Sequence, residues 1–232
     1  MKKLFFDIET LPADENSHGH LRHLYERKIA KRAPDPDNEP EAFEEFLNKT
    51  GFDGAFGKVL VIAYAIDDSP AKYLCNPQDE KETIEKFWDV AAGTDLFVGH
   101  NIRDFDLPFI VQRSIILGVK PSWHITQPPG KKPWEIDKYL DFARYKNFPI
   151  FDTMWEWSRW VDKWSNKGLE HLALAMGIPT PKEGIDGSQV NEFFKKGKTK
   201  EICEYCVRDV ETVREIYKRM TFESIDSKNL PF

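Results

Sequence analysis

The chain has 232 residues, of which 41% are hydrophobic and 31% charged, and its formal net charge is −6 at pH 7. This composition supports a folded core and excludes a disordered chain, and no apolar run approaches the ~20 residues of a membrane span. The acidic balance argues mildly against a protein that only binds nucleic acid, because such proteins usually present a basic face. The apolar run at the N-terminus ends after a few residues at an acidic residue, whereas a signal peptide has a longer apolar segment. We therefore expect a cytoplasmic protein without membrane contact.

The first predicted strand, residues 3–10, carries two carboxylates after its apolar start. Residues two apart in a strand point to the same face, so Asp7 and Glu9 lie side by side. Like charges this close repel, and a divalent cation that prefers carboxylate oxygens would compensate them. Without further information, the pair could equally end the strand in water.

The middle of the chain alternates strands and helices after a polar insertion at about 11–57 that holds a short helix ending at Gly51. β-branched runs and helical spacing predict strands at 58–68, 71–76 and 95–101, and helices at 79–92 and 106–118.

A second acidic stretch follows the strand that runs into Gly99, and it contains Asn101, Asp104 and Asp106 before the next helix. The carboxyl end of a strand that feeds a helix is where α/β proteins place their sites. Asp106 could alternatively be a simple cap, since a carboxylate is favoured at a helix start.

The C-terminal part begins with a second insertion at about 119–148 and continues with predicted helices at 151–161, 167–177 and 199–220. In the last helix, Tyr205 and Asp209 are four apart and share one face, beside a predicted core stripe of Ile202, Cys206, Val210, Val213 and Tyr217. Strands followed mostly by helices predict one α/β domain over 1–232, with a mixed sheet flanked by helices.

Taken in order, the motifs D-x-E, N-x-x-x-F-D and Y-x-x-x-D resemble those of the DEDD superfamily of 3′–5′ exonucleases, which have a ribonuclease H-like fold. The stretches "FDIET", "GHNIRDFDLPFI" and "YCVRDVETV" carry the resemblance, which runs from residue 3 to about 220. The chain most resembles the proofreading exonuclease domain of family B DNA polymerases, and "IDGSQVNEFFKKGKTKEICEYCVRDV" resembles a stand-alone bacterial group related to it. Tyr205 stands four residues before Asp209, as in the tyrosine branch, whereas the histidine branch has His where Glu204 stands.

The resemblance implies two divalent cations, Mg²⁺ or Mn²⁺, held by Asp7, Glu9, Asp106 and Asp209, with Asp7 between them and Tyr205 orienting the attacking water. Asp106, directly after Phe105, matches the family pattern where Asp104 does not. The resemblance also implies contact with the terminal nucleotide by Thr10, Leu11, Asn101 and Phe105. Asn101 could instead support the site, and Phe105 could instead pack in the core.

The implied substrate is the 3′ end of single-stranded nucleic acid, DNA in preference to RNA, and the implied reaction is two-metal phosphodiester hydrolysis. A protein partner in DNA repair or replication would fit this activity. The alternatives are a 3′–5′ exoribonuclease and an inactive nucleic-acid-binding module, and the second has less support because all four acids and Tyr205 are present.

Overall fold

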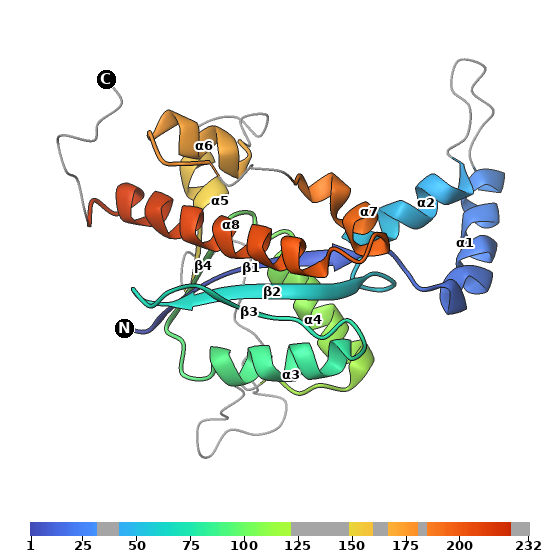
Figure 1. Cartoon of the computed structure of the whole chain (residues 1–232). Coiled ribbons are helices and arrows are strands. Elements are labelled where there is room, and N and C mark those ends of the chain that lie inside the picture. Colours follow the sequence, from blue (N-terminus) through green and yellow to red (C-terminus); the bar gives the residue numbers. More distant parts are fainter. Residues whose placement is uncertain (32–41, 122–148, 160–166, 181–184, 224–232) are drawn as a thin grey trace.

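The computed structural model describes residues 1–31, 42–121, 149–159, 167–180 and 185–223. Within these residues, one five-stranded sheet has the strand order β3-β2-β1-β4-β5 (Figure 1). The strands are β1 (Lys3–Leu11), β2 (Lys58–Ile66), β3 (Lys72–Leu74), β4 (Leu96–Gly99) and β5 (Ile150–Asp152). β2 runs antiparallel to both β1 and β3, whereas β4 and β5 run parallel to β1. The predicted mixed α/β sheet is confirmed.

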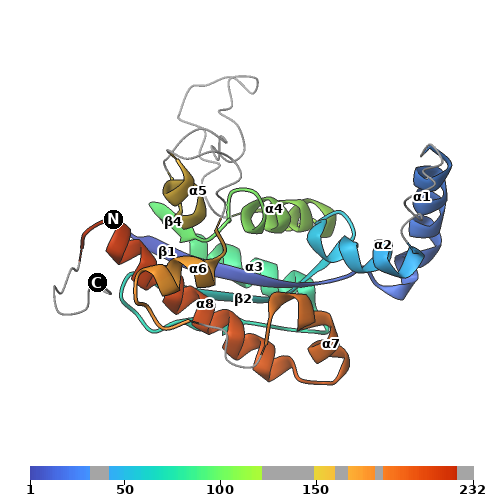
Figure 2. The ribbon, with the colours of Figure 1, turned by 90° about the horizontal axis from the view of Figure 1, so that it is seen from above.

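Helices cover both faces of this sheet. They are α1 (His18–Lys31), α2 (Phe43–Lys49), α3 (Glu80–Ala91), α4 (Asp106–Leu117), α5 (Thr153–Ser158), α6 (Leu169–Ala175), α7 (Val190–Lys195) and α8 (Thr199–Met220), with short 3₁₀ turns η1 (Glu15–Ser17), η2 (Thr50–Phe52) and η5 (Gly187–Gln189). Helix α8 crosses one face and α3 lies under the other (Figure 1), while α1 and α2 extend to one side (Figure 2).

Strand β1 lies in the middle of the sheet and divides two hydrophobic cores. Leu4, Phe6 and Ile8 belong to the core beneath α3 and α4, whereas Phe5 belongs to the core beneath α8. This alternation follows from the two-residue period of a strand, and it places Asp7 on the α8 face with Phe5, as predicted.

Helix α8 follows its predicted range and buries its predicted stripe. The buried stripe residues are Ile202, Cys206, Val210, Val213 and Tyr217. Basic residues in its last turn, Lys218 and Arg219, suit the negative end of the helix dipole. Packing of this stripe fixes the rotation of α8 and therefore the direction in which its polar residues point.

The insertion between β1 and β2 is fastened to the core where it ends. Arg113 of α4 forms a buried ion pair with Glu80 of α3 at 2.7 Å. The Arg113 guanidinium also donates to the Gly54 carbonyl at 3.2 Å, and Glu80 accepts from the Val59 backbone N–H at 2.9 Å. Because this buried ion pair also forms hydrogen bonds with the backbone at Gly54 and Val59, it connects the end of the insertion to α3 and α4.

Three elements were not anticipated. The start of the helix expected at 151–161 is strand β5, whose three residues pair with β4 in parallel. Helix α1 was not expected because only Leu21 in it is buried, and the six residues of α7 are too few for a periodic signal. Residues 122–148 of the second predicted insertion lie outside the described residues. In the described part of the chain, no helix is long and apolar enough to cross a membrane.

Candidate active site

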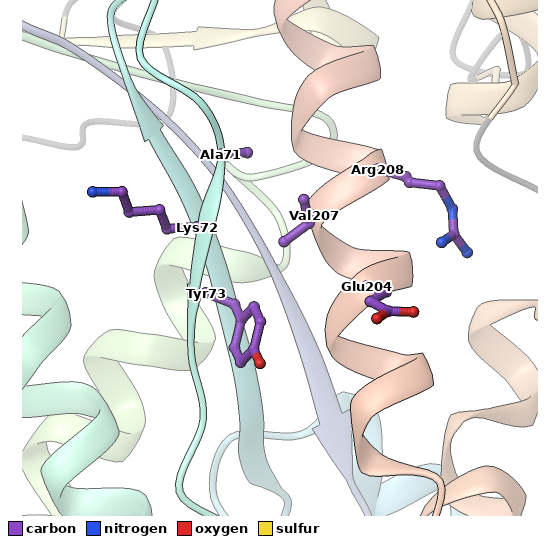
Figure 3. Close-up of a pocket in the computed structure, with 6 residues that line it drawn as sticks. All are labelled: Ala71, Lys72, Tyr73, Glu204, Val207 and Arg208. Atoms are coloured by element: carbon purple, nitrogen blue, oxygen red, sulfur yellow. The ribbon is translucent and has the colours of Figure 1, made fainter.

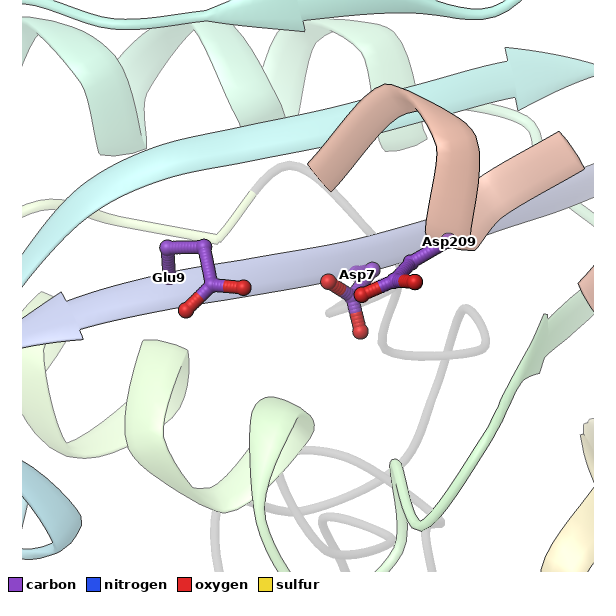
Figure 4. A group of neighbouring side chains, drawn as sticks. All are labelled: Asp7, Glu9 and Asp209. Atoms are coloured by element: carbon purple, nitrogen blue, oxygen red, sulfur yellow. The ribbon is translucent and has the colours of Figure 1, made fainter. Parts of the chain in front are cut away.

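Three carboxylates from distant parts of the chain meet on the α8 face of the sheet. Asp7 and Glu9 come from β1 and Asp209 comes from α8, and each offers an oxygen within 4.8 Å of the others. Figure 4 shows Asp209 beside Asp7, with Glu9 further along β1. The pairing of β1 with β2 shifts register between Glu9 and Thr10, an irregularity that often occurs next to functional sites.

The fourth acid, Asp106, lies at the start of α4 and approaches the edge of β1. The pairing of β1 with β4 ends at Phe5, so the Ile8 backbone N–H has no β4 partner in that ladder. The Asp106 carboxylate accepts from this N–H at 3.0 Å, and its side chain is buried. Asp106 therefore caps the edge of β1 where β4 turns away. Asp104, two residues earlier, is exposed.

Tyr205 and Cys206 of α8 border the same cluster. The Tyr205 hydroxyl shares a hydrogen bond with the Asp209 carboxylate one helical turn away. The buried Cys206 thiol lies 3.3 Å from Asp7 Oδ2 and 3.4 Å from the Asp7 carbonyl oxygen. The sequence predicted Cys206 only as a packing residue, because its contact with Asp7 spans 199 positions.

Burial and mutual repulsion disfavour the charged forms of these acids. Burial, followed by the charges of Asp106, Asp209 and Glu9, raises the pKa of Asp7 well above its usual range. Burial, followed by the charges of Asp209, Asp106 and Asp186, raises the pKa of Glu9 well above its usual range. Burial raises the pKa of Asp106 to about 8, against the lowering effect of the Ile8 N–H.

The residues present fit a site for hard divalent cations. The neighbouring charges that raise the pKa of Asp7 and Glu9 belong to other carboxylates, so a cation between these oxygens would relieve their mutual repulsion. Mg²⁺ and Mn²⁺ prefer carboxylate oxygens, and Mg²⁺ commonly combines one or two carboxylates with substrate phosphate. The 4.8 Å spacing of the offered oxygens allows Asp7, Glu9 and Asp209 to share one cation.

A buried carboxylate that the motifs did not single out, Asp152, shapes the turn before Asp106. It accepts from the backbone N–H of Asn101 at 2.9 Å and of Arg103 at 3.1 Å. It also caps α5 by accepting from Met154 and Trp155. An Asp near the start of the helix predicted at 151–161 is an N-cap signal that could have identified it. Asn101 itself adopts a left-handed conformation with φ of 63°.

The four residues expected to contact the terminal nucleotide lie in different settings. The Thr10 hydroxyl donates to the Gly51 carbonyl at 2.6 Å, and Leu11 is buried in the core beneath α8. Phe105 is partly buried against the other core. A cavity of about 350 Å³ is lined by Glu9, Thr10 and Phe105 among others, so two of the four residues face it. Contact with nucleic acid stays a prediction for all four.

A larger hollow of about 590 Å³ lies away from this cluster, between α8 and the edge strand β3 (Figure 3). Tyr73 from β3 and Val207 from α8 contribute to its lining. Glu204 and Arg208, which line it from α8 together with Val207, directly precede Tyr205 and Asp209. Adjacent residues of a helix project about 100° apart, so the two pairs point to different sides of α8. None of the clustered acids lines it.

Comparison with known proteins gives a family and a fold. A family model described as a predicted 3′–5′ exonuclease related to the exonuclease domain of PolB matches residues 58–227. β1, with Asp7 and Glu9, precedes the matched residues. No curated protein matches the sequence.

The structure is also similar to that of the family B DNA polymerase from the hyperthermophilic archaeon Pyrobaculum calidifontis, with a TM-score of 0.59 and 17% identity. The similarity covers 95% of this chain and 24% of the polymerase, so the chain spans about a quarter of that protein. At this identity the likeness shows the fold, which agrees with the predicted ribonuclease H-like arrangement.

Proposed function

The chain belongs to the family of predicted 3′–5′ exonucleases related to the exonuclease domain of PolB, and we propose that it removes nucleotides from the 3′ end of single-stranded nucleic acid, with DNA preferred to RNA. The observation that carries this proposal is the convergence of Asp7, Glu9 and Asp209 within 4.8 Å. A phosphodiester is anionic, and a bare carboxylate cluster would repel it. The reaction therefore requires cations between the protein and its substrate.

Asp7, Glu9, Asp106 and Asp209 would hold two cations, Mg²⁺ or Mn²⁺. When bound, such cations supply an activated water and stabilise the charge on the leaving oxygen. The chain itself contributes rigid placement of the oxygens. β1 pairs with β2 past both Asp7 and Glu9, and α8 is fixed by its buried stripe, so the carboxylates are arranged before substrate arrives.

Tyr205 would orient the attacking water instead of accepting its proton. Burial and the charge of Asp209 raise the pKa of Tyr205 above its ordinary value near 10, so the phenol stays protonated at neutral pH. A protonated phenol can donate and accept hydrogen bonds, but it is a poor general base at neutral pH. The hydrogen bond to Asp209 keeps its hydroxyl at the edge of the carboxylate cluster.

The proposal is tested with matched DNA and RNA oligonucleotides in Mg²⁺ and in Mn²⁺, each labelled at either the 5′ or the 3′ end. A 3′–5′ exonuclease yields a ladder from the 5′ label and immediate release of the 3′ label. Asp209→Asn and Asp106→Asn should each lower the rate at least ~100-fold, since even outer partners of metal ligands are worth 10–100-fold.

Asp104→Asn is the matched control, because Asp104 is exposed and only two residues from Asp106; its rate should stay near that of the wild type. An inactive wild-type protein under all these conditions would overturn the proposal. Activity of Asp209→Asn equal to wild type would overturn the site assignment and indicate a contaminating nuclease.

A further inference from the structure

The insertion between β1 and β2 contributes a wall to the cavity beside Glu9. The cavity has a volume of about 350 Å³, at the small end of the range for ligand sites. Ile8, Glu9 and Thr10 line it from β1, and Asn48 and Phe52 line it from the insertion. A segment without any assigned role therefore shares a cavity with Glu9, one member of the carboxylate cluster.

Hydrogen bonds fix the end of the insertion against β1. The Thr10 hydroxyl donates to the Gly51 carbonyl at 2.6 Å, and the Ala13 backbone N–H donates to the Thr50 hydroxyl at 2.8 Å. Thr50 and Gly51 are buried, whereas the next residue, Phe52, is 72% exposed. The backbone of Phe52 is thus anchored while its ring projects outward.

The Phe52 ring forms an aromatic pair with Phe105, the residue directly before Asp106. Their ring centroids are 6.2 Å apart with planes inclined at 53°, and Phe105 is supported from behind by Phe109 at 5.6 Å. Both Phe52 and Phe105 line the cavity. Phe105 is partly buried, so most of the free aromatic surface at this place belongs to Phe52.

The opposite side of the cavity is closed by contact between the insertion and α7. The Asn191 amide donates to the Asn48 side-chain oxygen at 3.4 Å, and both residues line the cavity. Asn48 and Asn191 thus bring the insertion and α7 together at the cavity that Phe52 lines.

We propose that Phe52 is a substrate-binding residue on whose ring a base at the 3′ end of a single strand stacks while the adjoining phosphodiester lies at the carboxylates. The inference rests on the proposed function and deepens it by naming the substrate as an unpaired end of any sequence. Every base offers an aromatic face, so stacking binds single strands with little sequence preference. Phe105, which precedes α4 and lines the same cavity, would contact the same 3′ end of the strand.

The test compares KM and kcat for a single-stranded oligonucleotide across variants of Phe52. Stacking on one aromatic side chain is worth roughly tenfold or more in binding, so Phe52→Ala should raise KM about tenfold and change kcat far less. Phe52→Tyr should restore KM, whereas Phe52→Leu, which keeps apolar bulk without a ring, should not. Since Phe52 is 72% exposed, these variants should melt within about 2 °C of wild type.

A substrate that lacks bases provides the second measurement. Abasic sites at the 3′-terminal or the adjacent position should raise KM of the wild type, and the same abasic substrate should raise KM of Phe52→Ala little further. Tyr73→Ala is the matched control, because Tyr73 is an exposed aromatic residue in the other hollow (Figure 3); its KM should not change.

The two proposals fail in distinguishable ways. If the wild type does not shorten oligonucleotides, the exonuclease function is wrong. If the wild type is active but Phe52→Ala keeps the wild-type KM, or if removal of the base costs both proteins equally, the role of Phe52 is wrong while the function stands.

Discussion

The acids at the site resist ionisation because they are buried together. Burial is the first cause of the raised pKa of Asp7, Glu9 and Asp106, and neighbouring carboxylates add to it for Asp7 and Glu9. A protein gains nothing in stability from such an arrangement without a cation. Strongly shifted pKa values of this kind cluster at functional sites.

This arrangement predicts how the stability of the metal-free protein depends on pH. The raised pKa of Asp106, about 8 against an ordinary value near 4, means that the folded state binds more protons than the unfolded state between these values. The free energy of unfolding should therefore fall as pH rises from 5 to 8 in EDTA, on the order of a few kcal/mol. Thermal melting at several pH values measures this loss.

Asp106→Asn provides the control for that loss. An amide can still accept from the Ile8 N–H but does not titrate, so the variant should be less sensitive to pH and more stable than wild type at pH 8 without metal. Asp104→Asn should follow the wild type. Equal slopes for wild type and Asp106→Asn would contradict the assignment of the raised pKa.

Tyr205 gives a second prediction for a single residue. Because its pKa is raised above an ordinary value near 10, it should contribute no titration step to the pH–rate profile at or below neutral pH. Tyr205→Phe should lower kcat roughly 10–100-fold, as loss of an outer partner of a metal ligand does, and leave the shape of the profile unchanged. A profile that loses a limb in Tyr205→Phe would show that the phenol exchanges a proton.

The turn from β4 to α4 depends on a residue from another element, Asp152 at the end of β5. Its carboxylate holds the Asn101 and Arg103 amides, and this turn leads directly to Asp106. The turn also needs Gly99, where a Cβ atom would lie 2.0 Å from the Ile102 side chain and 2.9 Å from the Phe6 carbonyl oxygen. Two residues outside the pattern N-x-x-x-F-D, Asp152 and Gly99, therefore position the Asp106 carboxylate.

Asp152→Ala should consequently damage both stability and activity. The loss of a cap and of two further hydrogen bonds to a charged group should cost roughly 2 kcal/mol or more, and displacement of Asp106 should lower activity beyond that. Asp79→Ala is the matched control, because Asp79 caps α3 by accepting from Glu82 far from the turn. It should lose about 1 kcal/mol and keep its activity, as urea unfolding and rate measurements can show.

Elements with strong periodicity could be predicted from the sequence, and those fixed by tertiary pairing could not. The two-residue period placed Asp7 and Glu9 on one face of β1, and the 3.6-residue period gave the range of α8. β5 was not predicted because its three residues directly precede a helix and pair with β4 only in the folded sheet. The contacts of Asp152 with the Asn101 and Arg103 amides, and of Cys206 with Asp7, link segments far apart in sequence, so no local pattern indicates these contacts.

At the scale of the whole molecule, the site exists only when β1, α4 and α8 are assembled. Asp7 and Asp209 are 202 positions apart, and their carboxylates repel each other in the assembled fold. Folding therefore costs free energy through this repulsion. Hydrophobic packing of the buried α8 stripe on β1 and β2 provides the stabilisation that offsets the cost.

A cation that binds only the folded state should raise the melting temperature of the whole protein. At 100 times its dissociation constant, a ligand adds about 2.7 kcal/mol of stability, which corresponds to roughly 5–10 °C for a chain of this size. Melting with millimolar Mg²⁺ or Mn²⁺ against EDTA measures the shift. Asp209→Asn should lose most of the shift, and a wild-type melting temperature unaffected by either cation would count against the carboxylate site.

The two sides of the cavity, β1 and the insertion that contains α2, should open on different timescales. β1 pairs with β2 from Leu4 to Leu11, past both Asp7 and Glu9, whereas α2 buries none of its residues. Amides of central strands exchange with solvent only in large openings, and those of lightly packed helices exchange in small local ones. Hydrogen exchange should therefore be slow for the β1 amides beside the carboxylates and much faster for the amides of α2, which leads into the anchored turn before Phe52.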